Sequence, residues 1–253
     1  MKLYGYSERG LVNALCYDCV HDQNGETLLA GMLQQACFPL LTDQPSFSTI
    51  QHATFLVEQS LSQFGDCDLI ILCDTNKRKK FAVFCEFKRG KGWSLKGEWK
   101  KFTGWIERRK GKNKIASNLF CQLHFKERFS SAIAEATPPY LADGLEFDEP
   151  LNIGRGNGRR KIGSKRTVLR AVDLIHPYVQ DCYFLMVTPQ QMDPKEMKSF
   201  VDQANNWQGN VRDWSTNRWG HLSLSVLHQC CQRNPEAFSH TLEIFDFNHG
   251  QLY

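Results

Sequence analysis

The chain has 253 residues, of which 42% are hydrophobic and 12% aromatic, and this fits one large domain or a domain with a long insertion. No apolar run approaches the roughly 20 residues of a membrane helix, and no apolar region follows Lys2 as in a signal peptide. We therefore expect a soluble, cytoplasmic protein with no membrane partner, rather than a membrane or secreted one.

Positive charge is concentrated in two segments, although the net charge is only +4. Residues 88–114 contain eleven Lys or Arg and two Glu, and residues 155–170 contain seven Lys or Arg and no acid. The rest of the chain is therefore acidic. Two basic segments on an acidic body indicate a polyanionic ligand, whereas either segment alone could be a solvated loop.

The ten cysteines are expected to be reduced thiols, because disulfides are rare in proteins without a secretory signal. Several lie in apolar runs, where a thiol packs as a small core side chain. Cys16 and Cys19 have the spacing of metal ligands, but the sequence has no second pair of this kind to complete a tetrahedral site. We therefore predict no structural zinc.

The first half of the chain predicts two helices followed by three strands. The first helix is predicted to start at the N-cap Ser7, with apolar residues at helical spacing from Leu11 to Cys19, and the second has such residues from Leu28 to Ala36. Strands are predicted over residues 52–63, 68–73 and 81–88, and the polar residues 74–80 form a hairpin connection. The basic stretch that follows, to about residue 113, has no assigned element.

The second half begins with a predicted helix over residues 114–136. One stripe of that helix carries Ile115, Leu119, Gln122, Lys126 and Phe129. A basic, Gly-rich excursion at about 140–168 follows. The remaining predicted elements are a strand at 183–188, a helix at 193–206, a short strand at 221–225, a helix through residue 230 and an edge strand at 242–247. This order predicts an α/β fold with a mixed central sheet flanked by helices, in a single domain over 1–253.

Three polar residues stand out in the predicted strands. Glu86 and Lys88 are two positions apart on one strand, so their side chains point to the same face, and Asp68 begins the strand before it. A buried Glu and Lys cost free energy unless they are paired or bound to a metal. Two carboxylates can hold Mg²⁺ and a lysine can stabilise charge on a phosphate, which favours phosphodiester hydrolysis. The alternative is a structural ion pair at the end of the sheet.

With Asp68 followed by Glu86-Phe87-Lys88, the chain resembles the PD-(D/E)xK nuclease superfamily over roughly residues 7–130, and more loosely at 183–188. The resemblance implies a restriction-endonuclease-like αβββαβ core and Mg²⁺-dependent cleavage, with Mn²⁺ as an alternative cofactor. It also implies a further acid from the first helix, Glu8, and a polar residue on the following helix, Gln122. The implied catalytic set is therefore Asp68, Glu86, Lys88, Glu8 and Gln122, with Asp68, Glu86 and Glu8 as metal ligands.

This chain departs from the superfamily's motif just before Asp68. The preceding residue is Cys67 where the motif has proline, and Asp66 is an alternative metal ligand. Asp68 is preferred because apolar strand residues follow it immediately.

The basic residues close to these motifs are the predicted contacts to nucleic acid, and tryptophans are interleaved with them. The alternative for Trp93, Trp99 and Trp105 is that they pack this segment onto the core. The predicted nucleic-acid contacts are Arg89, Lys91, Lys96, Lys100, Lys101, Arg155, Arg159, Arg160 and Lys161.

The predicted function is that of a metal-dependent nuclease acting on DNA, with RNA also open. A partner protein or a homo-oligomer is also open, and proteins with such domains often act in bacterial defence or in mobile elements. The alternatives are a catalytically silent module of the same fold, which binds nucleic acid or a partner protein, and a sensor of a small anionic nucleotide.

Overall fold

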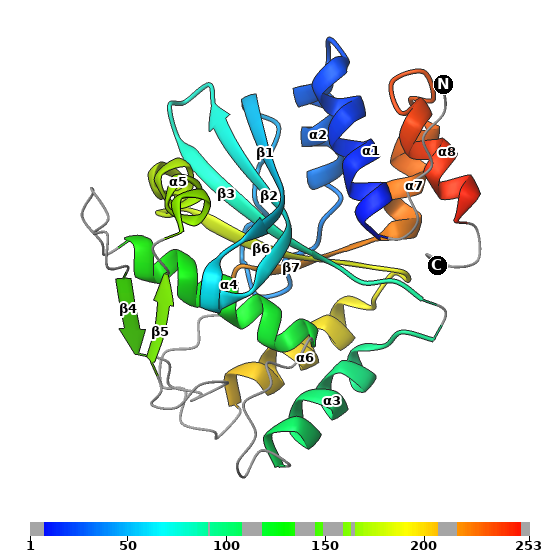
Figure 1. Cartoon of the computed structure of the whole chain (residues 1–253). Coiled ribbons are helices and arrows are strands. Elements are labelled where there is room, and N and C mark those ends of the chain that lie inside the picture. Colours follow the sequence, from blue (N-terminus) through cyan, green and yellow to red (C-terminus); the bar gives the residue numbers. More distant parts are fainter. Residues whose placement is uncertain are drawn as a thin grey trace.

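One mixed sheet of five strands, in the order β1-β2-β3-β6-β7, organises the chain (Figure 1). The computed structural model describes residues 8–90, 92–107, 118–134, 145–148, 159–162, 165–206 and 217–248. The first three strands are antiparallel neighbours, and β6 and β7 run parallel to β3. The bounds of the five strands are β1 Ile50–Ser60, β2 Asp66–Thr75, β3 Lys80–Phe87, β6 Cys182–Thr188 and β7 Trp219–Ser223.

Helices cover both faces of the sheet, which gives three layers (Figure 1). The face that we call face A is covered by α3 Leu95–Glu107, α4 Leu119–Ala134, α5 Arg166–Ile175 and α6 Pro194–Asn206. The opposite face, face B, is covered by α1 Glu8–His21, α2 Gly25–Leu33, α7 Leu224–Gln232 and α8 Ser239–Phe247. Two short 3-10 turns, η1 Ser62–Phe64 and η2 His176–Tyr178, complete the connections. The predicted α/β fold with a mixed sheet between helices is confirmed.

Strand β3 shows why the sheet is covered on both faces. Successive side chains of a strand point to opposite faces, and nearly all of β3 is apolar. Ala82 and Phe84 pack into the core on face A, while Val83 and Cys85 pack into the core on face B. The same alternation directs Glu86 to face A, beneath α4.

The structure corrects the element predicted at the end of the chain. The sequence predicts an edge strand over residues 242–247, but these residues belong to helix α8. The residues of α8 that are buried are Thr241, Ile244 and Phe245, which is helical and not alternating spacing. The carboxylate of Asp18 on α1 accepts hydrogen bonds from the backbone N and the hydroxyl of Thr241, at 2.8 and 2.7 Å, and so caps the start of this helix.

Two helices on face A were not predicted. Helix α3 lies within the basic stretch that had no assigned element, and α5 follows the Gly-rich excursion. The excursion itself contains a small antiparallel hairpin, in which β4 Leu145–Asp148 pairs with β5 Arg159–Ile162. Strand β5 packs beside η1. Among the residues described, no helix is both long enough and apolar enough to cross a bilayer.

Candidate functional site

The ends of strands β2 and β3 bring Asp68 and Glu86 together. The β2–β3 register ends at the pair Leu69 and Cys85. Beyond that pair the side chain of Asp68 continues the pairing, because its Oδ2 accepts a hydrogen bond from the backbone N of Phe87 at 2.8 Å. Asp68 is half-buried. The carboxylate of Asp68 therefore lies at the end of the β2–β3 pair, bonded to the residue next to Glu86.

Glu86 is fully buried, with 0% of its surface exposed. Of its two carboxylate oxygens, Oε2 has no hydrogen-bond partner among the described residues. Burial raises the pKa of Glu86 from its ordinary 4.5 to about 7, and the negative charge of Asp68 also raises it, against the opposing effect of Lys126. The ionised form of Glu86 is therefore disfavoured in this site.

Lys126 of helix α4 is the group nearest to Glu86. Its Nζ lies 3.1 Å from Glu86 Oε1, and only 1% of the residue is exposed. The same Nζ donates to the backbone carbonyl of Phe64 at 3.4 Å. Burial lowers the pKa of Lys126, but the charge of Glu86, the hydrogen bond to it and the neighbouring Cys67 and Asp68 together outweigh burial, so the pKa stands above its ordinary value. The ammonium is therefore charged at neutral pH.

Sequence reasoning did not assign Lys126 to the site, although a signal was present. Lys126 shares a helical stripe with Leu119 and Phe129, and both of these are buried in the face A core. A buried lysine in a largely apolar stripe favours a buried acid as its partner. The structure shows that this partner is Glu86 of β3.

Lys88 follows Glu86 at the end of β3. Its backbone N donates to Val187 at 2.8 Å, so the parallel pairing with β6 continues one residue past the strand. The alternation of the strand places its side chain on the same face as that of Glu86. Lys88 is half-buried, and its ammonium donates no hydrogen bond to, and forms no ion pair with, any described residue. This charge is therefore available to a ligand at the strand end.

The structure separates the two aspartates that the sequence left as alternatives. Asp66 is exposed at the start of β2, opposite Ser60 of β1. Asp68 instead bonds to Phe87, the neighbour of Glu86. Asp68 is therefore the aspartate that lies at the candidate site.

Glu8 does not join the two acids. It begins helix α1, which packs on face B, whereas Glu86 points to face A. Its Oε2 lies 3.4 Å from Nε of Arg89, just beyond the end of β3. Within the ranges that the structure describes, no three His, Cys, Asp or Glu side chains are grouped closely enough to hold a metal ion. The predicted set of three acidic ligands is therefore not assembled, and two acids remain.

Gln122 lies one helical turn before Lys126 on α4, so the two side chains share a face of the helix. The residue is half-buried, and its side-chain oxygen is buried with no hydrogen-bond partner among the described residues. Its predicted place on the helix beside the site is therefore consistent with the fold, and its role stays a prediction.

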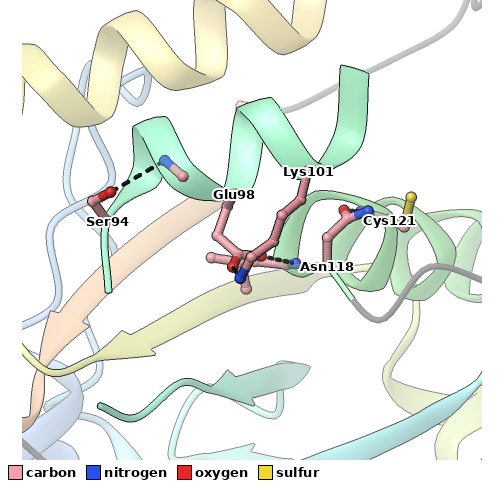
Figure 2. A network of polar contacts seen from close by, with 7 residues as sticks. Ser94, Glu98, Lys101, Asn118 and Cys121 are labelled. Carbon is pink, nitrogen blue, oxygen red and sulfur yellow. Dashed lines mark hydrogen bonds and ion pairs between the residues drawn. The ribbon is translucent and has the colours of Figure 1, made fainter. Parts of the chain in front are cut away.

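Helix α3 is held against α4 by a buried carboxylate (Figure 2). Glu98 is 2% exposed; its Oε2 accepts from the backbone N of Leu119 at 2.7 Å, and its Oε1 pairs with Lys101 at 2.7 Å. Asn118 caps α4 by accepting from the backbone N of Cys121 at 2.8 Å, and Ser94 accepts from Gly97 at the start of α3. The helix after the candidate site is thereby fixed to the helix that carries Lys126.

The predicted nucleic-acid contacts are distributed unevenly around this site. Lys96 and Lys100 are exposed on α3, and no described residue pairs with them. Lys101 is exposed but is already paired with Glu98, and Arg89 is paired with Glu8. Lys91 and Arg155 lie outside the described residues. The side chains of Arg159, Arg160 and Lys161 also lie outside them.

For residues 159–161 of the second basic segment, only the backbone is described. The hairpin register places Lys161 opposite Glu146 and Arg159 opposite Asp148. Opposite charges at facing positions of an antiparallel pair are favourable.

Two of the three tryptophans belong to the core rather than to an exposed stacking surface. Trp93 and Trp99 are partly buried against the face A core, and Trp99 contacts Phe102 and Phe120 with ring centroids 5.5 and 5.2 Å apart. The side chain of Trp105 lies outside the described residues. The packing alternative therefore holds for Trp93 and Trp99.

The ten cysteines are all free, and eight of them are buried. This confirms the prediction of structural thiols. Comparisons with protein-family models, with curated proteins and with solved structures gave no match.

Proposed function

We propose that the protein is a divalent-cation-dependent phosphodiesterase that cleaves DNA. The observation that carries this proposal is the pair Asp68 and Glu86 at one strand end, where one oxygen of the buried Glu86 carboxylate lies 3.1 Å from Lys126 and the other has no partner among the described residues. Burying a charge in this way is costly unless it serves a ligand. The order of a helix, three antiparallel strands, further helices and a parallel strand also supports the proposal, because it follows the αβββαβ order of PD-(D/E)xK nucleases.

The donor set suits a hard divalent cation. Mg²⁺ is commonly bound through one or two carboxylates, with waters and substrate phosphate completing its coordination. Asp68 and Glu86 would hold it, with Mn²⁺ as an alternative. When bound, the cation supplies a water of lowered pKa and charge neutralisation at the phosphate.

The remaining roles fall to cationic side chains that follow Glu86 in the chain. The ammonium of Lys88, which has no partner among the described residues, stabilises charge that develops on the phosphate. Lys96 and Lys100 stand exposed on α3, which follows β3 after a short connection, and they contact the phosphate backbone. No described element has the form of a module that reads bases, so the proposed cleavage depends little on sequence.

One observation favours a second function, that of a silent module which binds nucleic acid or a partner. Lys126 already neutralises Glu86, and both residues are buried. A site that had lost its metal could keep such a pair for stability alone.

Cleavage assays separate the two functions. Supercoiled plasmid, linear duplex DNA, single-stranded DNA and RNA are incubated with the protein in Mg²⁺, Mn²⁺ or EDTA. The proposal predicts cleavage of DNA that requires a divalent cation and stops in EDTA. Lys88→Ala should lower turnover more than nucleic-acid affinity, because the lysine acts mainly in the transition state. Binding without cleavage under every condition would favour the silent module, and cleavage of RNA alone would reassign the substrate.

A further inference from the structure

The pair formed by Glu86 and Lys126 is close but poorly hydrogen-bonded. The two side chains are 0% and 1% exposed, and Lys126 Nζ lies 3.1 Å from Glu86 Oε1, yet Glu86 Oε2 has no partner among the described groups. A permanent structural pair of this depth is favourable only with excellent geometry and with its remaining hydrogen-bonding groups satisfied. The Glu86–Lys126 pair is close, but it does not meet the second requirement, because Glu86 Oε2 is left without a partner.

Lys126 has other oxygens within reach. Its Nζ already donates to the carbonyl of Phe64 at 3.4 Å. The next residue is Gly65, where an added Cβ would lie 3.6 Å from Nζ, so the ammonium packs against backbone that carries no side chain. Gln122, one turn earlier on α4, has a buried side-chain oxygen with no hydrogen-bond partner among the described residues. Side chains on a helix lean toward its N-terminus, which brings Lys126 toward Gln122.

We propose that Lys126 is a further residue of the site, whose ammonium is the resident counter-ion that a divalent cation must displace from Glu86. The inference rests on the proposed function. Two cations cannot share one buried carboxylate without strong repulsion, so the ammonium and the metal compete for Glu86. On metal binding the ammonium turns to the Phe64 carbonyl and the Gln122 oxygen, and it stays buried and hydrogen-bonded.

This exchange makes Lys126 a determinant of metal affinity. The ammonium keeps Glu86 neutralised within the fold while no metal is bound, and this lowers the apparent affinity for the metal. Asp68 stays in place during the exchange, because one of its oxygens is fixed by the backbone N of Phe87.

The test is Mn²⁺ binding to chelator-treated protein, measured by calorimetry and by the Mn²⁺ electron paramagnetic resonance signal. Lys126→Met removes the competing charge and keeps an unbranched side chain. Lys126→Gln also removes the charge but keeps a donor for Glu86, so it serves if the methionine variant folds poorly. Lys198→Met is the matched control, because Lys198 is an exposed lysine on α6 without a pairing partner among the described residues.

The expected result is that both Lys126 variants bind one Mn²⁺ at least about tenfold more tightly than wild type, since a like charge next to the site has been removed. Lys198→Met should bind as wild type does. Saturable binding by wild type that is equal or weaker in the Lys126 variants would overturn the role of Lys126 and leave the proposed function standing. The absence of saturable binding in every protein would overturn both.

Discussion

Replacing Glu86 by glutamine should stabilise the metal-free protein at alkaline pH. Burial raises the pKa of this carboxyl from 4.5 to about 7, so the folded protein resists ionising a group that ionises freely once unfolded. A carboxyl with a raised pKa contributes stability that is fully present below pH 4.5 and is lost as the pH rises through 7. At 1.36 kcal/mol per pKa unit, the loss between pH 4.5 and pH 8 is about 3 kcal/mol.

Glu86→Gln removes this titration while it keeps the shape of the side chain. The variant and wild type should have similar stability near pH 4.5, where Glu86 is largely protonated in the folded protein. Toward pH 8 the variant should become more stable by about 3 kcal/mol, roughly 6–12 °C in Tm for a chain of this size. The assay is urea unfolding in EDTA at several pH values, with the two proteins compared at each. Comparing the two proteins cancels the contribution of titrating groups that do not interact with Glu86; Lys126 does interact with it, because ionised Glu86 raises the pKa of Lys126.

A structural ion pair predicts the opposite dependence. If ionised Glu86 stabilised the fold through Lys126, removing its charge would leave a buried ammonium unpaired and would cost about 3–5 kcal/mol at pH 8. A variant that falls below wild type as the pH rises would therefore refute the reasoning. Parallel stability curves would also refute it, because they would mean that the pKa of Glu86 is not raised.

Three other predictions concern α3, α8 and the thiols. Replacing Lys96 and Lys100 together by alanine should weaken binding to duplex DNA. The slope of the logarithm of the binding constant against the logarithm of the salt concentration should become shallower by about 0.9 for each phosphate that the protein no longer neutralises. Asp18→Ala should cost on the order of 3 kcal/mol in urea unfolding, because it leaves buried donors at the start of α8 without their acceptor. A thiol reagent should modify at most Cys37 and Cys230 in the folded protein, since the other eight are buried, and all ten after unfolding.

Matched controls make these outcomes interpretable. Alanine at Lys195 and Lys198 on α6 removes the same charge at exposed positions elsewhere, and an equal loss of DNA binding would show that only net charge matters. Asp246→Ala changes an exposed carboxylate on α8, and a cost equal to that of Asp18→Ala would remove the special role of Asp18. Rapid modification of more than two thiols in the folded protein would contradict the burial of the cysteines.

The strands were predictable because their signal is local. The apolar residues of β2 and β3 and the polar turn between them define the hairpin, and the alternation of β3 places Glu86 and Lys88 on one face. Helix α5 could also have been predicted. Val168, Ala171, Val172 and Ile175 are all buried at helical spacing, but they directly follow a basic, Gly-rich segment whose composition favours an excursion from the core.

The other differences between the predicted and the observed structure come from contacts between residues far apart in the chain. Helix α3 was not predicted because its buried face includes the charged Glu98, whose partner Leu119 lies 21 positions away. The pairing of Glu86 with Lys126 joins a strand to a helix across 40 positions of sequence. The apolar stripe of α4 indicates that Lys126 is buried, but no local pattern identifies Glu86 as its partner. Glu8 lies at the start of a helix, as expected, but the face on which that helix packs directs it to Arg89.

The most direct test of the central claim compares Asp68→Asn with Asp66→Asn in plasmid cleavage with Mg²⁺. Asparagine at position 68 keeps an oxygen that can accept from Phe87, so the fold is preserved while the charge is removed. Asp66 is exposed two residues away and is the matched control. We predict that Asp66→Asn cuts at the wild-type rate and that the cleavage rate of Asp68→Asn is at least about a hundredfold lower, as expected when a metal-binding charge is removed. Equal cleavage by the two variants, or no cleavage by wild type on any DNA substrate, would contradict it.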